Sequence, residues 1–388
     1  MKSGAPAISQ ASEIAPTALR TAPGGPADAT GQSEVALRLR ASSEYVAIPA
    51  FALTIAAVLF SIFLIAIGKS PFDFVDNIWR GGFGTPFSFQ NTLQRSAPLI
   101  LTALAVAIPA RIGLIMIGGE GALVLGGFAA AAVAVPMVGF VPPWLTLPIM
   151  AIAGVAVGAL WVGLAGFLRY ARGVNETISS LLLTYIGIAI MNFFVEGALR
   201  DLTNPNKPST KPIGDAYMVG KIPGTDVHWG FFAGVALAII LQLVMTRTTF
   251  GFAARVTGGN LRAALAQGLP VGRLIVSCAM IAGACAGLAG FFEVAAIQGR
   301  ANASLAAGYG FTGILISFLA RHSPLAIVPI AILFGGLVAA GGLIQRRMGL
   351  PDATVLVLQG LIFVVLLTSE TLYGRFAIFK TVKVLDRT

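Results

Sequence analysis

The chain has 388 residues, of which 56% are hydrophobic and only 11% are charged, and its mean hydropathy is +0.86. Soluble globular domains carry about 25% charged residues, so this composition excludes a soluble protein and predicts an integral membrane protein. Long apolar runs, rather than alternating strands of about ten residues, favour membrane-spanning helices over a barrel. We expect an all-α fold, a polytopic transmembrane helical bundle.

The basic charge does not indicate nucleic acid binding. The formal net charge is +10, but Lys and Arg lie singly between apolar runs and form no basic stripe. Cys278 and Cys285 lie in one apolar segment, and the histidines are His228 and His322. This spacing favours neither a metal site nor a disulfide framework, and we expect two inert thiols buried in a helix.

The two ends of the chain are predicted to be tails. Residues 1–44 are rich in Ala, Pro, Gly, Ser and Thr and contain no apolar segment, which is typical of a disordered tail. They are not a signal peptide, because the first apolar segment begins only near Val46 and no cleavage site follows a short apolar stretch. We expect a transmembrane domain at 45–375 and a second tail at 376–388.

About ten apolar segments approach the ~20 residues that a membrane-spanning helix needs. The segment at 308–320 is short for a span. The expected spans lie at about 46–68, 96–115, 121–141, 145–168, 175–199, 229–246, 274–297, 308–320, 324–343 and 353–372.

Two polar loops interrupt these segments, one at 200–228 and one at 247–273. With both termini in the cytoplasm, 16 of the 26 Lys and Arg residues lie on the inner side, as the positive-inside rule favours. The loop at 200–228 is then extracytoplasmic and the loop at 247–273 is cytoplasmic.

A lone carboxylate, Glu120, lies among glycines in the sequence Gly118-Gly119-Glu120-Gly121. The apolar run at 97–140 is too long for one span, and these glycines give the backbone the freedom to break it. At the membrane surface Glu120 would be a structural turn residue, the role that we favour. At mid-membrane depth it would face the solute path instead. The residues at four-residue spacing nearby are predicted to pack against other helices: Gly118, Ala122, Gly126, Ala130 and Ala134.

The predicted helix at 175–199 has one small and polar face. Glu176, Ser180 and Thr184 recur along it at four-residue spacing. This face either packs closely against another helix or lines a solute path, since an intramembrane carboxylate usually faces a cavity or a partner. If the solute is a nucleoside, Phe194 or Phe193 could stack on the base and Asn192 could bind its edge. The other acidic residues near predicted helix ends are expected to be solvated: Glu196, Glu293 and Glu370.

Two motifs mimic nucleotide sites. Gly308-Tyr-Gly-Phe-Thr-Gly313 matches GxGxxG but follows no strand, and Gly68-Lys69-Ser70 lacks the first glycine of a P-loop. We therefore expect no cofactor bound by this chain. Without hydrolase or metalloprotease motifs, transport is the function that the composition favours, and no catalytic residue is expected.

The loop at 247–273 contains a short helical pattern bounded by glycines and Pro270. A simple connection between two spans would need only a few residues. A basic, amphipathic insert of this kind can bind a soluble partner, or it can lie on the bilayer surface.

This loop also carries a family resemblance. The pattern G-x-x-x-R-x-x-G-x-N-x-x-A-A-x-x-x-G resembles the cytoplasmic loop of bacterial ABC importer permeases of the sugar and nucleoside type. Ile117-Gly-Gly-Glu-Gly121 and Gly173-Val-Asn-Glu-Thr-Ile-Ser179 resemble two further motifs of that family, in the same order. The resemblance covers roughly 95–372 and is greatest to the longer permease of nucleoside importers. The loop pattern is matched at Gly251, Arg255, Gly258, Asn260, Ala263, Ala264 and Gly268.

The resemblance implies a multi-pass permease of the bacterial inner membrane that forms the solute path and is not itself an enzyme. An ABC ATPase subunit would use the ATP, a second permease subunit would complete a heterodimer, and an extracytoplasmic binding lipoprotein would deliver a nucleoside or sugar. In the family the loop couples the permease to the ATPase, which implies this role for Arg255, Gly258, Asn260, Arg262, Ala263, Ala264 and Gly268. The candidates for the solute path are Glu120, Asn175, Glu176, Ser180, Thr184, Asn192 and Phe194.

The sequence is also compatible with other solutes and with other transporter classes. Met116, Ala122 and Thr184 replace polar residues of the family motifs, so the solute can be a nucleoside, ribose or another simple sugar. A transporter of another class, driven by a proton gradient, would use Glu120 and Glu176 as buried proton carriers. A channel is disfavoured because the sequence lacks charged rings or a carbonyl filter.

Overall fold

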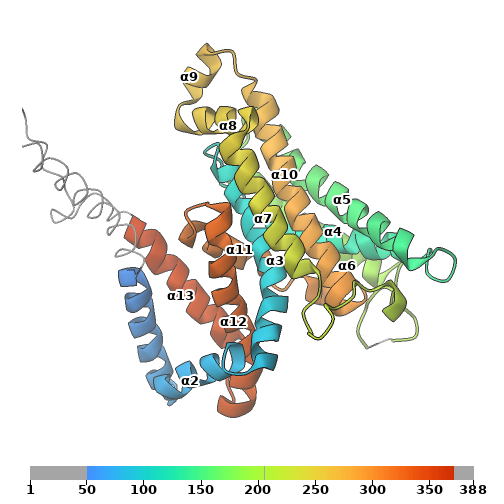
Figure 1. Cartoon of the computed structure of the whole chain (residues 1–388), viewed down its shortest axis with the longest axis vertical. Helices are drawn as coiled ribbons and strands as arrows, with labels where there is room; N and C mark the ends of the chain where they lie inside the picture. Colours follow the sequence, from blue (N-terminus) through green and yellow to red (C-terminus); the bar gives the residue numbers. More distant parts are fainter. Residues whose placement is uncertain (1–49, 205, 371–388) are drawn as a thin grey trace, which may run out of the picture. The chain divides into compact units, whose positions relative to one another are not determined.

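The structure is a computed structural model, and it describes residues 50–204 and 206–370 (Figure 1). Secondary structure in this part consists of helices, with two isolated β-bridges, Ser209–Asn302 and Lys221–His228. The all-α expectation is confirmed. The predicted tails at 1–44 and 376–388 and the side chain of Glu370 lie outside the described residues.

The helices follow the apolar segments in chain order. A first helix, Ala50–Ala66, precedes α2. The next are α2 (Pro71–Gly82), α3 (Pro86–Ala110), α4 (Gly119–Ala134), α5 (Pro143–Arg172), α6 (Glu176–Glu196) and α7 (Gly230–Arg247). Then come α8 (Thr249–Gly259), α9 (Leu261–Ala266), α10 (Val271–Phe292), α11 (Tyr309–Leu319), α12 (Pro324–Met348) and α13 (Ala353–Glu370), with short turns η1 (Asp215–Tyr217), η2 (Glu293–Gln298) and η3 (Ala303–Leu305).

A helix lies at the position of each expected span, but fewer helices are long enough to cross a membrane. In the described part, six helices have the length and hydropathy of a span, or up to seven if Ala50–Ala66 and α2, which meet at 114°, form one bent span. The chain is thus a multi-pass membrane protein, and the expected count of about ten spans is not confirmed. Among the helices that fall short, α4 has 16 residues and α11 has 11.

Sequence analysis did not predict α2 or the first turns of α3. Both helices begin with a capping residue followed by proline: the Ser70 side chain accepts from Asp73 N, and the Thr85 side chain accepts from Ser88 N. This arrangement is a known helix start signal. A hydropathy reading misses these turns because polar residues occupy them.

The centre of the bundle is formed by α4, α5 and α10, which approach each other backbone to backbone. A Cβ atom at Gly287 in α10 would lie 2.1 Å from the Gly154 carbonyl oxygen in α5, and one at Gly126 in α4 would lie 2.5 Å from Gly287 Cα. Only glycine permits this approach. The predicted packing role of the small residues in α4 is confirmed at Gly126. Cys278 and Cys285 are buried free cysteines in α10, as expected.

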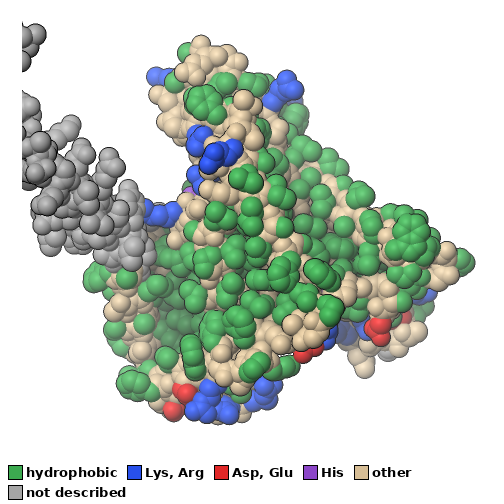
Figure 2. Space-filling view, viewed as in Figure 1, with side chains coloured by type: hydrophobic (Ala, Val, Ile, Leu, Met, Phe, Trp, Pro, Cys, Tyr) green, Lys and Arg blue, Asp and Glu red, His purple; other side chains and the backbone are tan. Residues whose placement is uncertain are grey.

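The surface agrees with a membrane location. Hydrophobic side chains cover the flank along α7 and α10, and Lys and Arg side chains gather at the two ends of that flank (Figure 2). The segment at 200–228 precedes α7 and α8 follows it, so the two predicted polar loops lie at opposite ends of an 18-residue helix. Which end faces the cytoplasm stays a prediction.

Candidate functional site

The apolar run at 97–140 breaks where the glycines predict. Helix α3 ends at Ala110, and α4 begins at Gly119. Glu120 lies in the first turn of α4 and is 1% exposed. Its two carboxylate oxygens accept hydrogen bonds from the backbone N–H groups of Gly308, at 2.7 Å, and Gly310. Both donors lie at the start of α11.

Glu120 therefore caps a helix other than its own. The first N–H groups of a helix have no partner inside it, and the N-cap residue of α11, Gly308, supplies no side-chain hydrogen bond. Only glycine leaves room for this contact at position 310, because a Cβ atom there would clash with Glu120 N at 2.3 Å. The contacts are those of a structural residue that joins the starts of α4 and α11, and both carboxylate oxygens are engaged.

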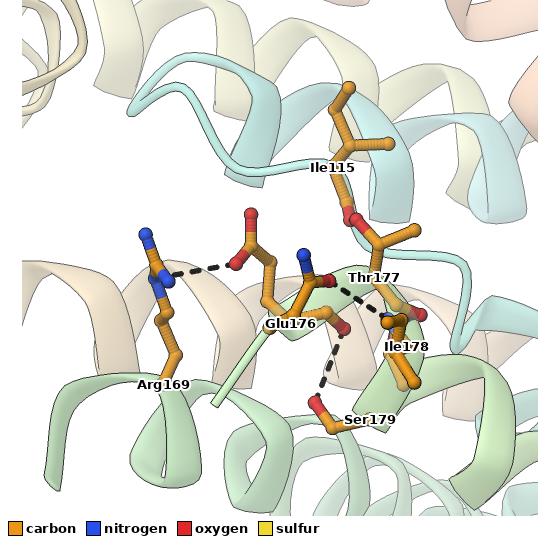
Figure 3. A network of polar contacts seen from close by, with 8 residues as sticks. Ile115, Arg169, Glu176, Thr177, Ile178 and Ser179 are labelled. Atoms are coloured by element: carbon orange, nitrogen blue, oxygen red, sulfur yellow. Dashed lines mark hydrogen bonds and ion pairs between the residues drawn. The ribbon is translucent and has the colours of Figure 1, made fainter. Parts of the chain in front are cut away.

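The start of α6 anchors the segment that joins α3 to α4 (Figure 3). The Thr177 hydroxyl donates to the Ile115 carbonyl at 2.7 Å, and the Ile117 N–H donates to the Ser180 hydroxyl at 3.0 Å. Arg169 at the end of α5 pairs with Glu176, with 3.3 Å between Nε and Oε2. Asn175 caps α6 by accepting from Ile178 N at 3.1 Å. The predicted path residues Asn175, Glu176 and Ser180 therefore all make structural contacts around the start of α6.

The remaining candidates on α6 also pack within the bundle. Thr184 donates to the Ser180 carbonyl at 3.1 Å, and a Cβ atom at Gly121 would lie 2.6 Å from Thr184 Cα. The Phe194 ring stacks on Phe128 with centroids 5.6 Å apart, and Asn192 is half-buried. Their assignment to the solute path stays a prediction.

Two expectations for acidic residues have different outcomes. Glu196 at the end of α6 is exposed, as expected for a solvated residue. The same expectation was wrong for Glu293, which is 2% exposed. The physical reason is that the chain remains helical after α10 ends at Phe292: it continues as the π-helical turn η2, which keeps Glu293 inside the bundle.

The loop at 247–273 folds into α8 and α9, and the motif residues explain its shape. A Cβ atom at Gly251 would lie 2.4 Å from the Met245 carbonyl oxygen, and one at Gly258 would lie 2.2 Å from the Arg111 carbonyl oxygen. The Asn260 side chain caps α9 by accepting from Ala263 N at 3.1 Å. Gly268 adopts a left-handed φ of 73°, and Ala264 is fully buried.

The other side of this helical pair is open. Arg255 on α8 and Arg262 on α9 are exposed, and Leu261 and Leu265 are 49% and 58% exposed. A groove of about 850 Å³ runs between these leucines and the residues around Tyr170. The pair thus presents cationic and apolar side chains together, which suits a soluble protein partner.

A chain of contacts leads from α8 to the turn between α11 and α12. Gly258 packs on the backbone of Arg111, and Arg111 Nε donates to the His322 carbonyl at 3.2 Å. The His322 Nδ1 lies 2.9 Å from the Ser317 hydroxyl. Arg321 and His322 have φ values of 51° and 55°, a left-handed conformation that costs about 1 kcal/mol or more per non-glycine residue.

Burial and neighbouring charges lower the pKa values of His322 and Arg111. Burial, and then the neighbouring Arg111 guanidinium, lower the pKa of His322 to about 4. Burial, and then the charge of Arg255, lower the pKa of Arg111. Contact between these groups places the exposed α8, the α3–α4 connection and the end of α11 in one electrostatic network.

Two cavities lie beside α11, and sequence analysis did not find them. A cavity of about 610 Å³ is lined from α2, α3, α11, α12 and α13, and its polar lining residues include Asn91, Arg95 and Tyr309. A second cavity of about 890 Å³ is lined mainly from α11 and α13 and is largely apolar. Thr312 and Gln359 line both. The available sequence signal was Gln359, an uncharged polar residue inside the apolar segment at 353–370.

None of the predicted path residues lines either cavity. Helix α6 contributes only Leu181 to the larger one. The structure thus brings together the predicted loop residues around α8 and α9, and it places the α6 residues at helix contacts.

Comparison with known proteins agrees with this architecture. The chain is 34% identical to the glucose ABC transporter permease protein TsgB13 of Haloferax volcanii, over 79% of this chain and 83% of the relative. It is 28% identical to the guanosine ABC transporter permease protein NupP of Bacillus subtilis, over 87% and 96%. It is 27% identical to the nucleoside ABC transporter permease protein NupB of Lactococcus lactis, over 74% and 82%. Residues 88–367 match the family described as branched-chain amino acid transport system / permease component, so the chain belongs to this family of membrane permease subunits.

Proposed function

We propose that this chain is the permease subunit of an ATP-driven importer of nucleosides in the bacterial inner membrane. The observation that supports it most directly is the exposed helical pair α8 and α9. This pair is built from the residues of the loop motif, and Gly251 and Gly258 attach it to the bundle. The permease family and the relatives named for guanosine and nucleosides support the same function.

In this proposal the ATPase docks on α8 and α9. Arg255 and Arg262 supply positive charge, and Leu261 and Leu265 supply apolar surface beside the groove. Asn260, Ala263, Ala264 and Gly268 maintain the shape of the pair. The ATPase binds and hydrolyses ATP, so this chain has no catalytic residue and needs no cofactor of its own.

Movement of α8 would reach the bundle through Arg111 and His322. A shift of Gly258 acts on the backbone of Arg111, and the Arg111 side chain holds the turn at the end of α11. The start of α11 is fixed to α4 by Glu120. Helix α11 is therefore held at both ends, and it carries Thr312 beside the two cavities. This arrangement supports a mechanism in which ATP-driven motion opens and closes the space beside α11.

A second, unlike permease subunit is part of the proposal. The relatives include two guanosine permease proteins of Bacillus subtilis, NupP and NupQ, at 28% and 27% identity. They also include two nucleoside permease proteins of Lactococcus lactis, NupB and NupC. Such pairs support a heterodimer, and an extracytoplasmic binding lipoprotein would deliver the solute to it.

A sugar importer is the second candidate. It is favoured by the relative named for glucose, TsgB13, which has 34% identity to this chain. A proton-driven secondary transporter is less well supported, because the carboxylates that it would use are engaged. Glu120 accepts two backbone hydrogen bonds, and Glu176 pairs with Arg169.

Uptake by cells tests the proposal. In the native host, deletion of this chain should abolish high-affinity uptake of radiolabelled guanosine, and the wild-type chain on a plasmid should restore it. Radiolabelled glucose is measured in parallel. Loss of glucose uptake with intact guanosine uptake would select the sugar importer, and intact uptake of both would contradict the proposed solutes.

A further inference from the structure

Thr312 and Gln359 occupy the boundary between the two cavities. Thr312 lies on α11 and Gln359 on α13, and the Thr312 hydroxyl donates to Gln359 Oε1 at 3.1 Å. Among the side chains that line the larger cavity, these two are the polar ones, and the rest are apolar. Pockets for small molecules have this composition: a mainly apolar wall with a few placed polar groups that fix orientation.

The amide of Gln359 has an unused donor. Gln359 is 5% exposed, and its Nε2 atom has no hydrogen-bond partner among the described residues. Exchange of the amide oxygen and nitrogen would leave an unused acceptor in its place. A buried polar atom without a partner is costly, and a bound solute beside it would remove that cost.

The walls of the two cavities differ in a way that suits a two-part solute. In the smaller cavity, Asn91 and Arg95 offer hydrogen-bond donors, and Arg346 and Asp352 balance each other in charge. In the larger cavity, the aromatic rings of Phe311, Phe318 and Phe363 form part of the wall. Volumes of about 610 and 890 Å³ are those of small-molecule sites.

We propose that Thr312 and Gln359 form the solute contact of the transport path. They hydrogen-bond a neutral ring that carries hydroxyl groups, the polar cavity holds the hydroxyl groups, and the aromatic wall accepts the flat heterocycle of a nucleoside. This inference rests on the proposed importer function and deepens it. It places the contact on α11 and α13, whereas most of the candidates from sequence analysis lie on or beside α6.

The test uses the complete importer in membranes of the native host and compares uptake of radiolabelled guanosine. The double variant Thr312→Val and Gln359→Leu removes both polar groups and keeps the side-chain volumes similar. The matched control is Thr354→Val, which also removes a buried hydroxyl from α13 but lines neither cavity. Concentration of each variant in the membrane is measured by immunoblot, and KM and maximal rate are measured separately.

The inference predicts that the double variant has a KM for guanosine raised about tenfold or more, the effect of losing one or two hydrogen bonds. Its amount in the membrane should match that of the wild type, because removal of an unpartnered amide leaves no new unsatisfied group. The single variant Gln359→Asn keeps Thr312 and an amide group, so its KM for guanosine should lie between those of the wild type and the double variant. The control Thr354→Val should have an unchanged KM.

Several results would overturn the inference. A double variant with an unchanged KM shows that the solute binds elsewhere. If the double variant has less protein in the membrane and an equally reduced maximal rate, with an unchanged KM, then Thr312 and Gln359 have only a structural role. A lipid in the larger cavity would also leave KM unchanged. Failure of the proposed function is recognised separately, since wild-type membranes would then take up no guanosine in an ATP-dependent manner.

Discussion

Glu120 joins two helices that begin inside the bundle, because its carboxyl group lies in the first turn of α4 and accepts from two N–H groups at the start of α11. The variant Glu120→Gln keeps one acceptor oxygen but turns an NH2 group toward a backbone N–H of α11. We expect this change to lower the free energy of unfolding by roughly 1–3 kcal/mol, measured as a lower thermal midpoint of the purified protein in detergent.

The control for this prediction is Glu196→Gln, because Glu196 is exposed at the end of α6. It should leave the thermal midpoint unchanged. If Glu120→Gln instead assembles with wild-type stability and loses uptake, Glu120 contacts the solute and the structural assignment is wrong.

Gly310 provides a second test of the same joint. In Gly310→Ala the new methyl group would lie 2.3 Å from Glu120 N, and overpacking of this kind costs about 1–3 kcal/mol or more. Gly342→Ala is the matched control, since the nearest atom to its Cβ, an Arg346 guanidinium nitrogen, lies 3.9 Å away. The thermal midpoint of unfolding is measured for both variants, and Gly310→Ala should have the lower one. Equal midpoints would show that α4 and α11 do not touch here.

For single residues, the sequence predicted where the chain breaks but not which groups Glu120 contacts there. The glycines around Glu120 indicated where the run must bend. The partner donors, at Gly308 and Gly310, lie far along the chain, and no local pattern connects them. Gln359 was missed for the same reason, because its environment comes from α11.

Among the elements, α9 depends on a single capping residue. Asn260→Ala removes the hydrogen bond to Ala263 N and should destabilise the start of α9 by about 1 kcal/mol. The exposed helix then frays, and we expect weaker recovery of the ATPase with the tagged chain and slower uptake, at an unchanged thermal midpoint of the bundle.

Asn260→Asp is the matched control, since aspartate caps helices as well as asparagine does. Uptake in this variant should remain near the wild-type rate. Equal recovery of the ATPase with Asn260→Ala and Asn260→Asp would show that the cap of α9 is not needed for docking.

The turn between α11 and α12 predicts a dependence on pH. The pKa of His322 is about 4 in the folded protein and about 6.5 in an unfolded chain. Between these values the unfolded state binds the proton and the folded state does not. Stability therefore falls as the pH drops from about 6.5 to about 4.

The measurement is the thermal midpoint as a function of pH for the wild type and for His322→Asn. His228 contributes in the same direction, because burial lowers its pKa to about 4 as well, so only the difference between the two curves reports on His322. The loss between pH 6.5 and pH 4 should be smaller in the variant. Parallel curves would contradict the assignment.

The sequence predicted most elements and missed those that hydropathy does not reveal. Apolar length located a helix at every expected span, but it could not separate a full crossing from the short helices α4 and α11. Helix α11 can begin within the bundle because Glu120 accepts from the N–H groups of Gly308 and Gly310 at its start. Helix α2 carried its own signal, Ser70 before Pro71, which a hydropathy window does not read.

For the whole molecule, we propose that a separate ATPase subunit drives this membrane permease through α8 and α9. Composition indicated a membrane protein, and the lack of hydrolase and nucleotide-site motifs favoured transport. The proposed coupling loop was recognised from its resemblance to a family motif, in which glycines and a helix cap at fixed positions define a local shape. The proposed solute contact combines residues from separate helices, so it can be inferred only from the folded bundle.

Reconstitution tests this account most directly. The tagged chain is purified from native membranes in mild detergent, alone or with the subunits that remain bound, and each preparation is placed in proteoliposomes with the binding lipoprotein. We predict uptake of guanosine only by the complex that contains the ATPase, and only with ATP. Uptake by the chain alone, driven by a proton gradient without ATP, would contradict the account.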